Sequence, residues 1–240
     1  MCRLLFLLNN SKKKENILRF LSQSELSKNL RDGYGLGWFD NKKKKWNIHK
    51  YSAIYTKDPE LEETLEKIEN SSIIIGHIRY KTIGNISFEN THPFLYKNQI
   101  FCHNGFIQDF LVNKEKILKK IDKKYINSIQ GETDSEHLFY FLLTCKDIVK
   151  KNKTESEFML DVFTLFFKEI EEMNILILAN IIFATDKTCV ITRYDTKLEK
   201  RLLYSNTNDG LIISTQPIVK KGSHLLKEKS INIIDHSFII

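Results

Sequence analysis

The chain has 240 residues, a formal net charge of +7 and 42% hydrophobic residues, with only 9 glycines and 3 prolines. This composition excludes collagen-like, low-complexity and strongly disordered proteins, and it predicts a single folded domain over residues 2–240. The positive charge lies mostly on lysines in separate short runs, such as Lys12–Lys14 and Lys42–Lys45. Such runs are typical of a solvated surface, and specific nucleic-acid binding is not expected.

The first half of the chain alternates between strand and helix patterns. Strand-forming residues predict strands over residues 2–8, 33–39, 46–54, 71–80 and 99–105. Helices are expected around residues 15–30 and 58–70. In the second of these, Asp58 is the expected N-cap and Pro59 the first helical residue. Residues 40–45 predict a hairpin loop, and an irregular loop is expected to pass through residues 90–93.

The second half begins with helices and ends in strands. A helical pattern covers residues 110–124, and two longer helices are expected around residues 134–151 and 155–172. Strands are expected over residues 175–185, 189–194, 201–206, 210–218 and 230–235. Strands at both ends of the chain that enclose central helices predict two sheets with helices on the outside.

The cysteines and the apolar runs indicate the cellular setting. The 4 cysteines are too few and too scattered for a disulfide framework, and no Cys-x-x-Cys pair predicts a metal site. The apolar segment Leu4–Leu8 is shorter than the core of a signal peptide. The run from Ile175 to Ala184 is about half as long as a membrane span. We therefore expect a cytoplasmic protein that does not enter a membrane.

The alternating glycines of DGYGLGWF do not match the dinucleotide-binding fingerprint G-x-G-x-x-G. In a strand, the large side chains of this segment lie on one face and Gly33, Gly35 and Gly37 on the other. A glycine stripe of this kind indicates that another segment approaches the backbone closely.

Cys2 directly follows the initiator Met1. Removal of Met1 would leave a thiol and a free α-amine on one residue. Because the amine titrates at about 7.7–8.0 and the thiol at about 8.5, the amine can take the proton of the thiol, directly or through a water molecule. Cys2 would then be both nucleophile and base. The alternative is that Cys2 is a small buried residue at the start of a strand.

His103, Asn104 and Gly105 come at the end of an apolar strand. Asn-Gly is typical of a tight hairpin turn. In the functional alternative, the Asn104 amide and the Gly105 N–H point at one spot and form an oxyanion hole.

Two further segments contain charged residues that are candidates for substrate binding. Arg79 and Thr82 lie at a strand end, where they would clamp a carboxylate if Arg79 is not simply solvated. Thr133 and Glu136 predict a capping box, and Asp134 adds an acidic residue to the first turn of that helix. A buried Asp134 would instead bind a substrate ammonium group.

Taken in chain order, these segments resemble the class II glutamine amidotransferases, the N-terminal nucleophile hydrolases that begin with a cysteine. The matching segments are MCRLL, DGYGLGWF, GHIRYKTIG, NTHPF, FCHNGF, GETDSEHLF and IISTQPI. The resemblance implies an α+β fold, a four-layer αββα sandwich of two mainly antiparallel sheets, and it looks closest to the small stand-alone members. Thr215 and Gln216 depart from the Ser-Glu-Pro that is usual in the family.

The resemblance also implies roles at the reaction centre. Cys2 is the implied nucleophile, and Asn104 and Gly105 are the implied oxyanion hole. No cofactor or metal is implied.

The remaining implied roles concern the glutamyl end of the substrate. Arg79 and Thr82 hold its α-carboxylate and Asp134 its α-ammonium. His103 belongs to this substrate-binding group as support for the loop rather than as a base.

Two functions are therefore considered. The first is an amidohydrolase that cleaves the γ-amide of glutamine or of a γ-glutamyl compound through a cysteine thioester, with water as the default acceptor because the fold uses up the 240 residues. The second is a non-catalytic or ammonia-supplying subunit that works only with a partner enzyme. Selectivity for the departing amine is expected from the loop around Gly84–Asn90 and from the glycine-striped strand.

Overall fold

The strands form two antiparallel sheets in the computed structural model, which describes residues 2–26, 31–151, 153–195, 202–219 and 222–235. The first sheet contains, in spatial order, β11 (His224–Leu225), β9 (Leu203–Thr207), β10 (Gly210–Ser214), β1 (Arg3–Leu8), β4 (Ile73–Ile78), β2 (Tyr34–Asp40) and β3 (Lys45–Tyr51). The second sheet contains β12 (Ser230–Asp235), β8 (Thr188–Asp195), β7 (Ile177–Ala184), β6 (Gln99–Ile107) and β5 (Phe94–Tyr96).

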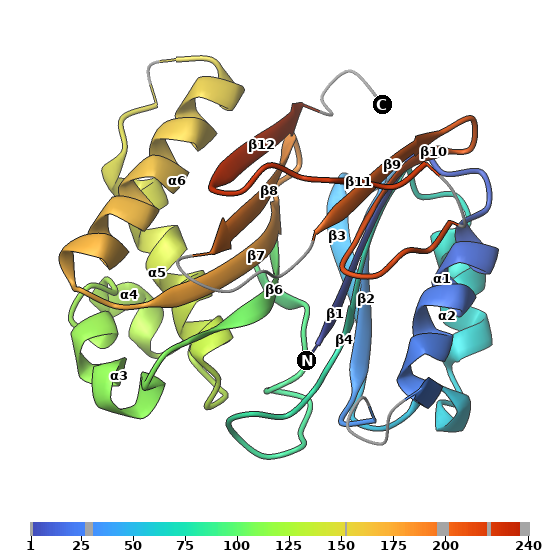
Figure 1. Cartoon of the computed structure of the whole chain (residues 1–240), viewed down its shortest axis with the longest axis horizontal. Helices are drawn as coiled ribbons and strands as arrows, with labels where there is room; N and C mark the ends of the chain where they lie inside the picture. The colour runs from blue at the N-terminus through green and yellow to red at the C-terminus, as the bar shows by residue number, and fades with distance from the viewer. Residues whose placement is uncertain (1, 27–30, 152, 196–201, 220–221, 236–240) are drawn as a thin grey trace.

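Helices cover the outer face of each sheet, and the two sheets pack against each other (Figure 1). The first sheet is covered by α1 (Lys13–Leu21) and α2 (Leu61–Ile68). The second is covered by α3 (Phe110–Leu118), α4 (Lys123–Ile126), α5 (Asp134–Ile148) and α6 (Glu155–Glu172). The predicted αββα sandwich is therefore confirmed. Among the described residues, no helix is long and apolar enough to cross a membrane.

The sequence of β1 explains why this strand is central. Leu5 and Leu7 point toward α1 and α2, whereas Leu4 and Phe6 point into the core between the sheets. All four side chains are fully buried. A strand that is apolar on both faces is stable only between two covering layers, so this run of leucines and phenylalanine favours the interior of a sandwich.

The glycine stripe of β2 allows the two sheets to approach. Tyr34, Leu36 and Trp38 pack on the helix side of the sheet, as predicted. On the other face, a Cβ atom at Gly35 would lie 2.1 Å from the carbonyl oxygen of His92. One at Gly37 would lie 2.3 Å from a terminal methyl group of Ile100. The stripe thus contacts protein, and it is not among the residues that line the two cavities beside Cys2.

Several predicted boundaries were wrong. The helix expected over residues 15–30 ends as an α-helix at Leu21 and continues as a 3₁₀-helix over Ser22–Leu26, and its last residues, 27–30, lie outside the described part of the chain. The helix expected over 110–124 is divided into α3 and α4. The irregular loop ends at β5, which was not predicted.

The N-cap of α2 was also predicted wrongly. The helix starts at Leu61 with Glu60 as its N-cap, and Asp58 lies outside it. The Asp58 carboxylate instead binds Nε2 of His49 at 2.6 Å and accepts a hydrogen bond from the Tyr34 hydroxyl. Its other carboxylate oxygen accepts the N–H of Glu60 at 2.9 Å, so Asp58 orders the turn before α2 and also ties it to β2 and β3.

The expected capping box of α5 is half present. The Thr133 hydroxyl accepts the Glu136 N–H at 3.2 Å, as predicted. The Glu136 carboxylate does not return to Thr133 but accepts the N–H groups of Gln130 and Gly131, at 3.0 and 2.6 Å. Glu136 thereby orders the turn before the helix rather than closing its first turn.

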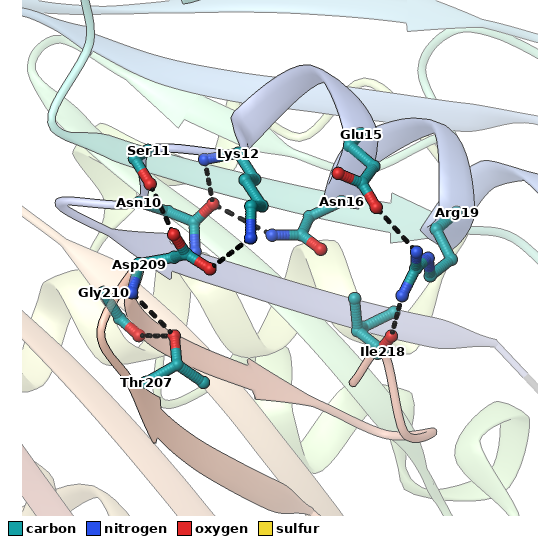
Figure 2. Close-up of polar contacts among 10 residues, drawn as sticks. All are labelled: Asn10, Ser11, Lys12, Glu15, Asn16, Arg19, Thr207, Asp209, Gly210 and Ile218. Carbon is teal, nitrogen blue, oxygen red and sulfur yellow. Dashed lines mark hydrogen bonds and ion pairs between the residues drawn. The ribbon is translucent and has the colours of Figure 1, made fainter. Parts of the chain in front are cut away.

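A polar cluster fastens the β9–β10 hairpin to the turn between β1 and α1 (Figure 2). The Asp209 carboxylate accepts hydrogen bonds from the Ser11 hydroxyl at 2.9 Å and the Lys12 ammonium at 2.8 Å. The Ser11 N–H donates to the Asp209 carbonyl at 2.8 Å. These contacts hold the start of β10 beside the end of β1, which matters because β10 flanks the strand that follows Cys2.

The two glycines of β2 offer a matched test of the sheet packing. We expect Gly35→Ala to lower the free energy of unfolding by about 3 kcal/mol and Gly37→Ala by about 1 kcal/mol. The reason is that the new methyl group meets a backbone carbonyl at position 35 but the movable end of a side chain at position 37. Urea unfolding monitored by circular dichroism measures both values, and equal losses would contradict this explanation.

Candidate functional site

Cys2 lies at the start of a strand that is hydrogen-bonded on both edges. β1 pairs with β4 on one side and with β10 on the other. Beyond the end of β10, the Thr215 hydroxyl accepts the N–H of Leu4 at 3.0 Å, and the Thr215 N–H donates to the Leu4 carbonyl at 3.2 Å. The backbone next to Cys2 is therefore fixed, and Thr215 has a structural role that its sequence position did not reveal.

The thiol of Cys2 is bound by the backbone of Tyr80. The Tyr80 N–H donates to Sγ at 3.2 Å, and Sγ can donate to the Tyr80 carbonyl at 3.5 Å. Burial raises the pKa of the Cys2 thiol, while the Tyr80 N–H acts in the opposite direction because it stabilises a thiolate. The positive charge of Arg79 also acts to lower this pKa. The Asp134 carboxylate acts to raise it, and the net direction of the pKa is upward, so burial outweighs the groups that favour a thiolate.

Asn104 and Gly105 lie inside β6, which continues to Ile107. The hairpin-turn alternative is therefore wrong. In β6 the two residues pair with Asn180 and Ala179 of β7. A Cβ atom at Gly105 would lie 1.8 Å from the carbonyl oxygen of Leu178, so only glycine fits at this position.

Arg79 is 3% exposed and is not simply solvated. Its guanidinium donates to the carbonyls of Ile83 at 3.0 Å and Asn85 at 2.8 Å. These bonds shape the loop after β4, and the Asn90 side chain fastens the loop from the other side by accepting the N–H of Glu132 at 2.8 Å. Two of the five guanidinium N–H groups contribute to these bonds, and Thr82 lies in the loop that they order.

Asp134 is the first residue of α5 and is 5% exposed. Its carboxylate accepts the N–H of Ile107 at 2.8 Å and that of Ser135 at 2.8 Å. A carboxylate has about four acceptor positions, so these bonds orient Asp134 and leave capacity for a further donor. The bond to Ile107 also joins α5 to the end of β6.

His103 supports the same junction. Its Nε2 lies 2.9 Å from the Leu178 carbonyl, which can only accept, so Nε2 carries a proton. Its Nδ1 lies 2.9 Å from the Ser135 hydroxyl. His103 thus bridges β7 and α5 through both ring nitrogens, which fits the expected supporting role better than that of a base.

Two cavities meet at Cys2 and bring the expected site residues together. The smaller cavity, of about 20 Å³, is polar and is lined by Cys2, Arg79, Tyr80, Thr82, Ile83, Asn90, His92, His103, Gly105, Thr133, Asp134 and Ser135. The larger cavity, of about 550 Å³, is lined by Cys2, Tyr80, Thr82, Ile83, Asn104, Gly105 and the segment Phe106–Val112. Within the described ranges, no group of three or more His, Cys, Asp or Glu side chains could hold a metal ion.

The sequence did not reveal several residues of this site. Tyr80 contributes through its backbone, which carries no residue-specific signal. The segment Phe106–Val112 lines the larger cavity. Its apolar residues directly after CHNG were a usable signal, but their position could not be judged without the end of β6 and the start of α3. Of the loop expected to select the departing amine, Gly84–Asn90, only Asn90 lines either of these cavities.

Comparison with known proteins identifies similar sequences and a family model that matches this chain. A family model described as "Glutamine amidotransferases class-II" matches residues 1–205. The chain is 42% identical over 84 residues to the "Probable glutamine amidotransferase DUG3" of Saccharomyces cerevisiae, an alignment that covers 35% of this chain and 24% of the relative. It is 30% identical over 142 residues to the amidophosphoribosyltransferase of Methanocaldococcus jannaschii, covering 56% of this chain and 28% of that protein. The chain thus spans less than a third of either relative.

A solved structure shares the fold. It is that of a glutamine aminotransferase class-II domain protein from Silicibacter pomeroyi, which superposes with a TM-score of 0.66 at 15% identity. The superposition covers 97% of this chain and 94% of that one.

A pair of buried histidines lies beside the site, and one of them, His92, lines the smaller cavity. The ring centroids of His77 and His92 are 4.0 Å apart, and both residues are less than 5% exposed. Burial lowers the pKa of His77 to about 3, and the positive charge of Arg79 acts in the same direction. Burial also lowers the pKa of His92 well below its usual range. Both rings are therefore neutral in the folded protein at neutral pH.

This pair predicts a loss of stability in mild acid. A histidine whose pKa is lowered by folding stabilises the fold above its unfolded pKa of about 6.5, and this contribution falls as the pH decreases below that value. Each buried ring should reduce the free energy of unfolding by about 1.4 kcal/mol per pH unit between pH 6 and pH 4. Urea unfolding at several pH values measures this slope. His92→Phe should decrease it, whereas His224→Phe, at an exposed position, should leave it unchanged; equal slopes in all three proteins would contradict the assignment.

Proposed function

The chain belongs to the class II glutamine amidotransferases, and on that basis we propose that it hydrolyses the γ-amide of glutamine or of a γ-glutamyl compound through Cys2. The observation that carries the proposal is the position of the Cys2 thiol where the two cavities meet. Arg79 and Asp134 line the smaller cavity, and Asn104 lines the larger one. Charged groups for an amino acid end and an amide donor for an oxyanion thus line cavities that share one sulfur atom.

The proposed reaction begins after Met1 is removed. The new α-amine of Cys2 takes the proton of the thiol, and the thiolate attacks the carbon of the substrate γ-amide. The carbonyl oxygen becomes an oxyanion, which the Asn104 amide and the Gly105 N–H stabilise by hydrogen bonds. The C–N bond then breaks, and the departing amine takes the proton from the Cys2 ammonium. A γ-glutamyl thioester remains on Sγ.

Water completes the cycle. The α-amine, again neutral, accepts a proton from the water molecule that attacks the thioester carbon. The C–S bond breaks, glutamate is released, and the proton returns to the thiolate. The polar cavity serves this sequence by holding the glutamyl end in one place: the remaining N–H groups of Arg79 bind the α-carboxylate together with Thr82, and Asp134 binds the α-ammonium.

The first prediction for this function concerns the nucleophile. A glutamine-like electrophile should modify Cys2 and not the other cysteines, because Cys102, Cys145 and Cys189 are buried. Burial also raises the pKa of the Cys145 thiol to about 12, which removes its thiolate at neutral pH. Peptide mass spectrometry identifies the modified residue and reports whether Met1 is retained. Cys2→Ala should lose both labelling and glutamate release, whereas Cys145→Ala should keep both; labelling of another cysteine with loss of activity would overturn the assignment.

The second prediction separates chemistry from binding. Asn104→Ala should lower kcat by roughly 10² to 10³, the usual cost of losing one oxyanion donor. Arg79→Lys should chiefly raise KM, because the substrate carboxylate keeps its charge throughout the reaction. Asp134→Asn should also act chiefly on KM, because Asp134 is proposed to bind the substrate ammonium. Asparagine is chosen over alanine because its amide oxygen can still accept the N–H of Ile107. Steady-state kinetics with glutamine measures each variant, and an Asn104→Ala variant altered only in KM would exclude the oxyanion role.

A further inference from the structure

The two cavities beside Cys2 differ sharply in size and chemistry. The polar cavity of about 20 Å³ contains the groups proposed to hold the glutamyl end. The other cavity, of about 550 Å³, has the volume of a site for a small organic molecule. Ammonia, the amine released from glutamine, is about the size of a water molecule, which occupies about 30 Å³ in the liquid. The larger cavity is therefore far larger than the released ammonia, and it has room for a bigger departing group.

The wall of the larger cavity is mainly apolar. Phe106, Ile107 and Phe110 line it from the end of β6 and the start of α3, and Ile83 lines it from the loop after β4. Among its described lining residues, Asp109 carries the one charged side chain. This wall would favour an apolar group, and Asp109 would disfavour a carboxylate.

The mouth of the cavity supports the same conclusion. Leu111 and Val112, in the first turn of α3, also line the cavity and are 76% and 78% exposed. Large apolar side chains beside a pocket gain stability when a ligand covers them. Because these two side chains lie on the pocket that contains the nucleophile, a substrate group that extends outward from Cys2 would cover them.

We propose that this pocket binds the departing half of a γ-glutamyl amide and selects amines with an apolar aryl or alkyl group and no carboxylate. The inference rests on the proposed function, since it assigns the second half of the same substrate. The charged groups of the glutamyl half lie at the polar cavity, the scissile amide lies at Sγ, and the amine substituent lies against Phe110, Leu111 and Val112. When the C–N bond breaks, the free amine leaves through the mouth of this pocket.

Three substrates of matched glutamyl end test the proposal: γ-glutamylbenzylamide, γ-glutamylglycine and glutamine. Glutamate release is measured with the full chain after its N-terminus has been checked by mass spectrometry. We expect kcat/KM for the benzylamide to exceed that for γ-glutamylglycine by about tenfold or more, as for a contact of one or two carbon groups in an apolar pocket. The value for the benzylamide should also exceed that for glutamine.

Variants assign the selectivity to the pocket. Leu111→Asn should lower the ratio of kcat/KM for the benzylamide to kcat/KM for γ-glutamylglycine. Asp109→Asn should raise kcat/KM for γ-glutamylglycine. The matched control is Leu160→Asn, since Leu160 is an exposed leucine on α6, at 44%, and does not line either cavity; its ratio should equal that of the parent. Calorimetric binding of the two amides to Cys2→Ala provides a readout that does not need turnover.

The outcomes distinguish the pocket from the proposed function. If glutamine is hydrolysed but γ-glutamylglycine matches or exceeds the benzylamide, the pocket assignment is overturned and the function stands. An unchanged ratio in Leu111→Asn would also overturn it, and would favour a partner surface on α3 instead. If no glutamate is released from any substrate and Cys2→Ala binds none of them, both proposals are wrong. The pocket is supported if Cys2→Ala binds the benzylamide more tightly than γ-glutamylglycine and the parent protein also has the higher kcat/KM for the benzylamide.

Discussion

The antiparallel pairing of β1 on both of its edges is the constraint on which the site depends. Strand ends usually fray, but the Leu4 backbone is bonded to Thr215 beyond the end of β10. The Cys2 thiol is bonded in turn to the backbone of Tyr80, directly after β4 and Arg79. The start of β1 is thus held by hydrogen bonds to two other segments. The nucleophile proposed at Cys2 needs this rigidity, because small displacements of the reacting atoms are costly in rate.

Backbone groups hold the polar side chains of the site before any substrate is present. Arg79 is bound by two carbonyls of its own loop, and Asp134 by the N–H groups of Ile107 and Ser135. These bonds satisfy buried charges that would otherwise destabilise the fold. They also limit the side chains to one orientation, so less conformational entropy is lost on binding. The same contacts therefore serve both stability and preorganisation.

Much of this arrangement could be predicted from the sequence, and the exceptions have physical reasons. Periodicity gave most strands and the long helices, since β1 and α6 carry strong apolar patterns. The N-cap at Asp58 failed because α2 begins only at Leu61. The Asp58 carboxylate is shared between the nearby Glu60 N–H and two partners on other strands, Tyr34 and His49, which only the fold brings to it. The hairpin turn at Asn104 failed because local turn preference was weaker than the pairing of β6 with β7. The apolar residues that follow Gly105 were not predicted to line a cavity, because the sequence does not show which apolar side chains the fold leaves facing a pocket.

The bond between Asp134 and Ile107 connects the two halves of the proposed chemistry. Asp134 begins α5, and Ile107 ends the strand that carries Asn104 and Gly105, so the ammonium site and the oxyanion donors belong to one body, the second sheet with its helices. Arg79 and the Cys2 strand belong to the other sheet. A γ-glutamyl substrate would therefore bridge both sheets, with its α-carboxylate on one and its α-ammonium on the other. The close packing at Gly37, against Ile100 of β6, holds the two sheets near each other, and their separation would limit the length of a substrate that bridges them. A stripe of glycines outside both cavities would in this way help to determine what Cys2 can attack.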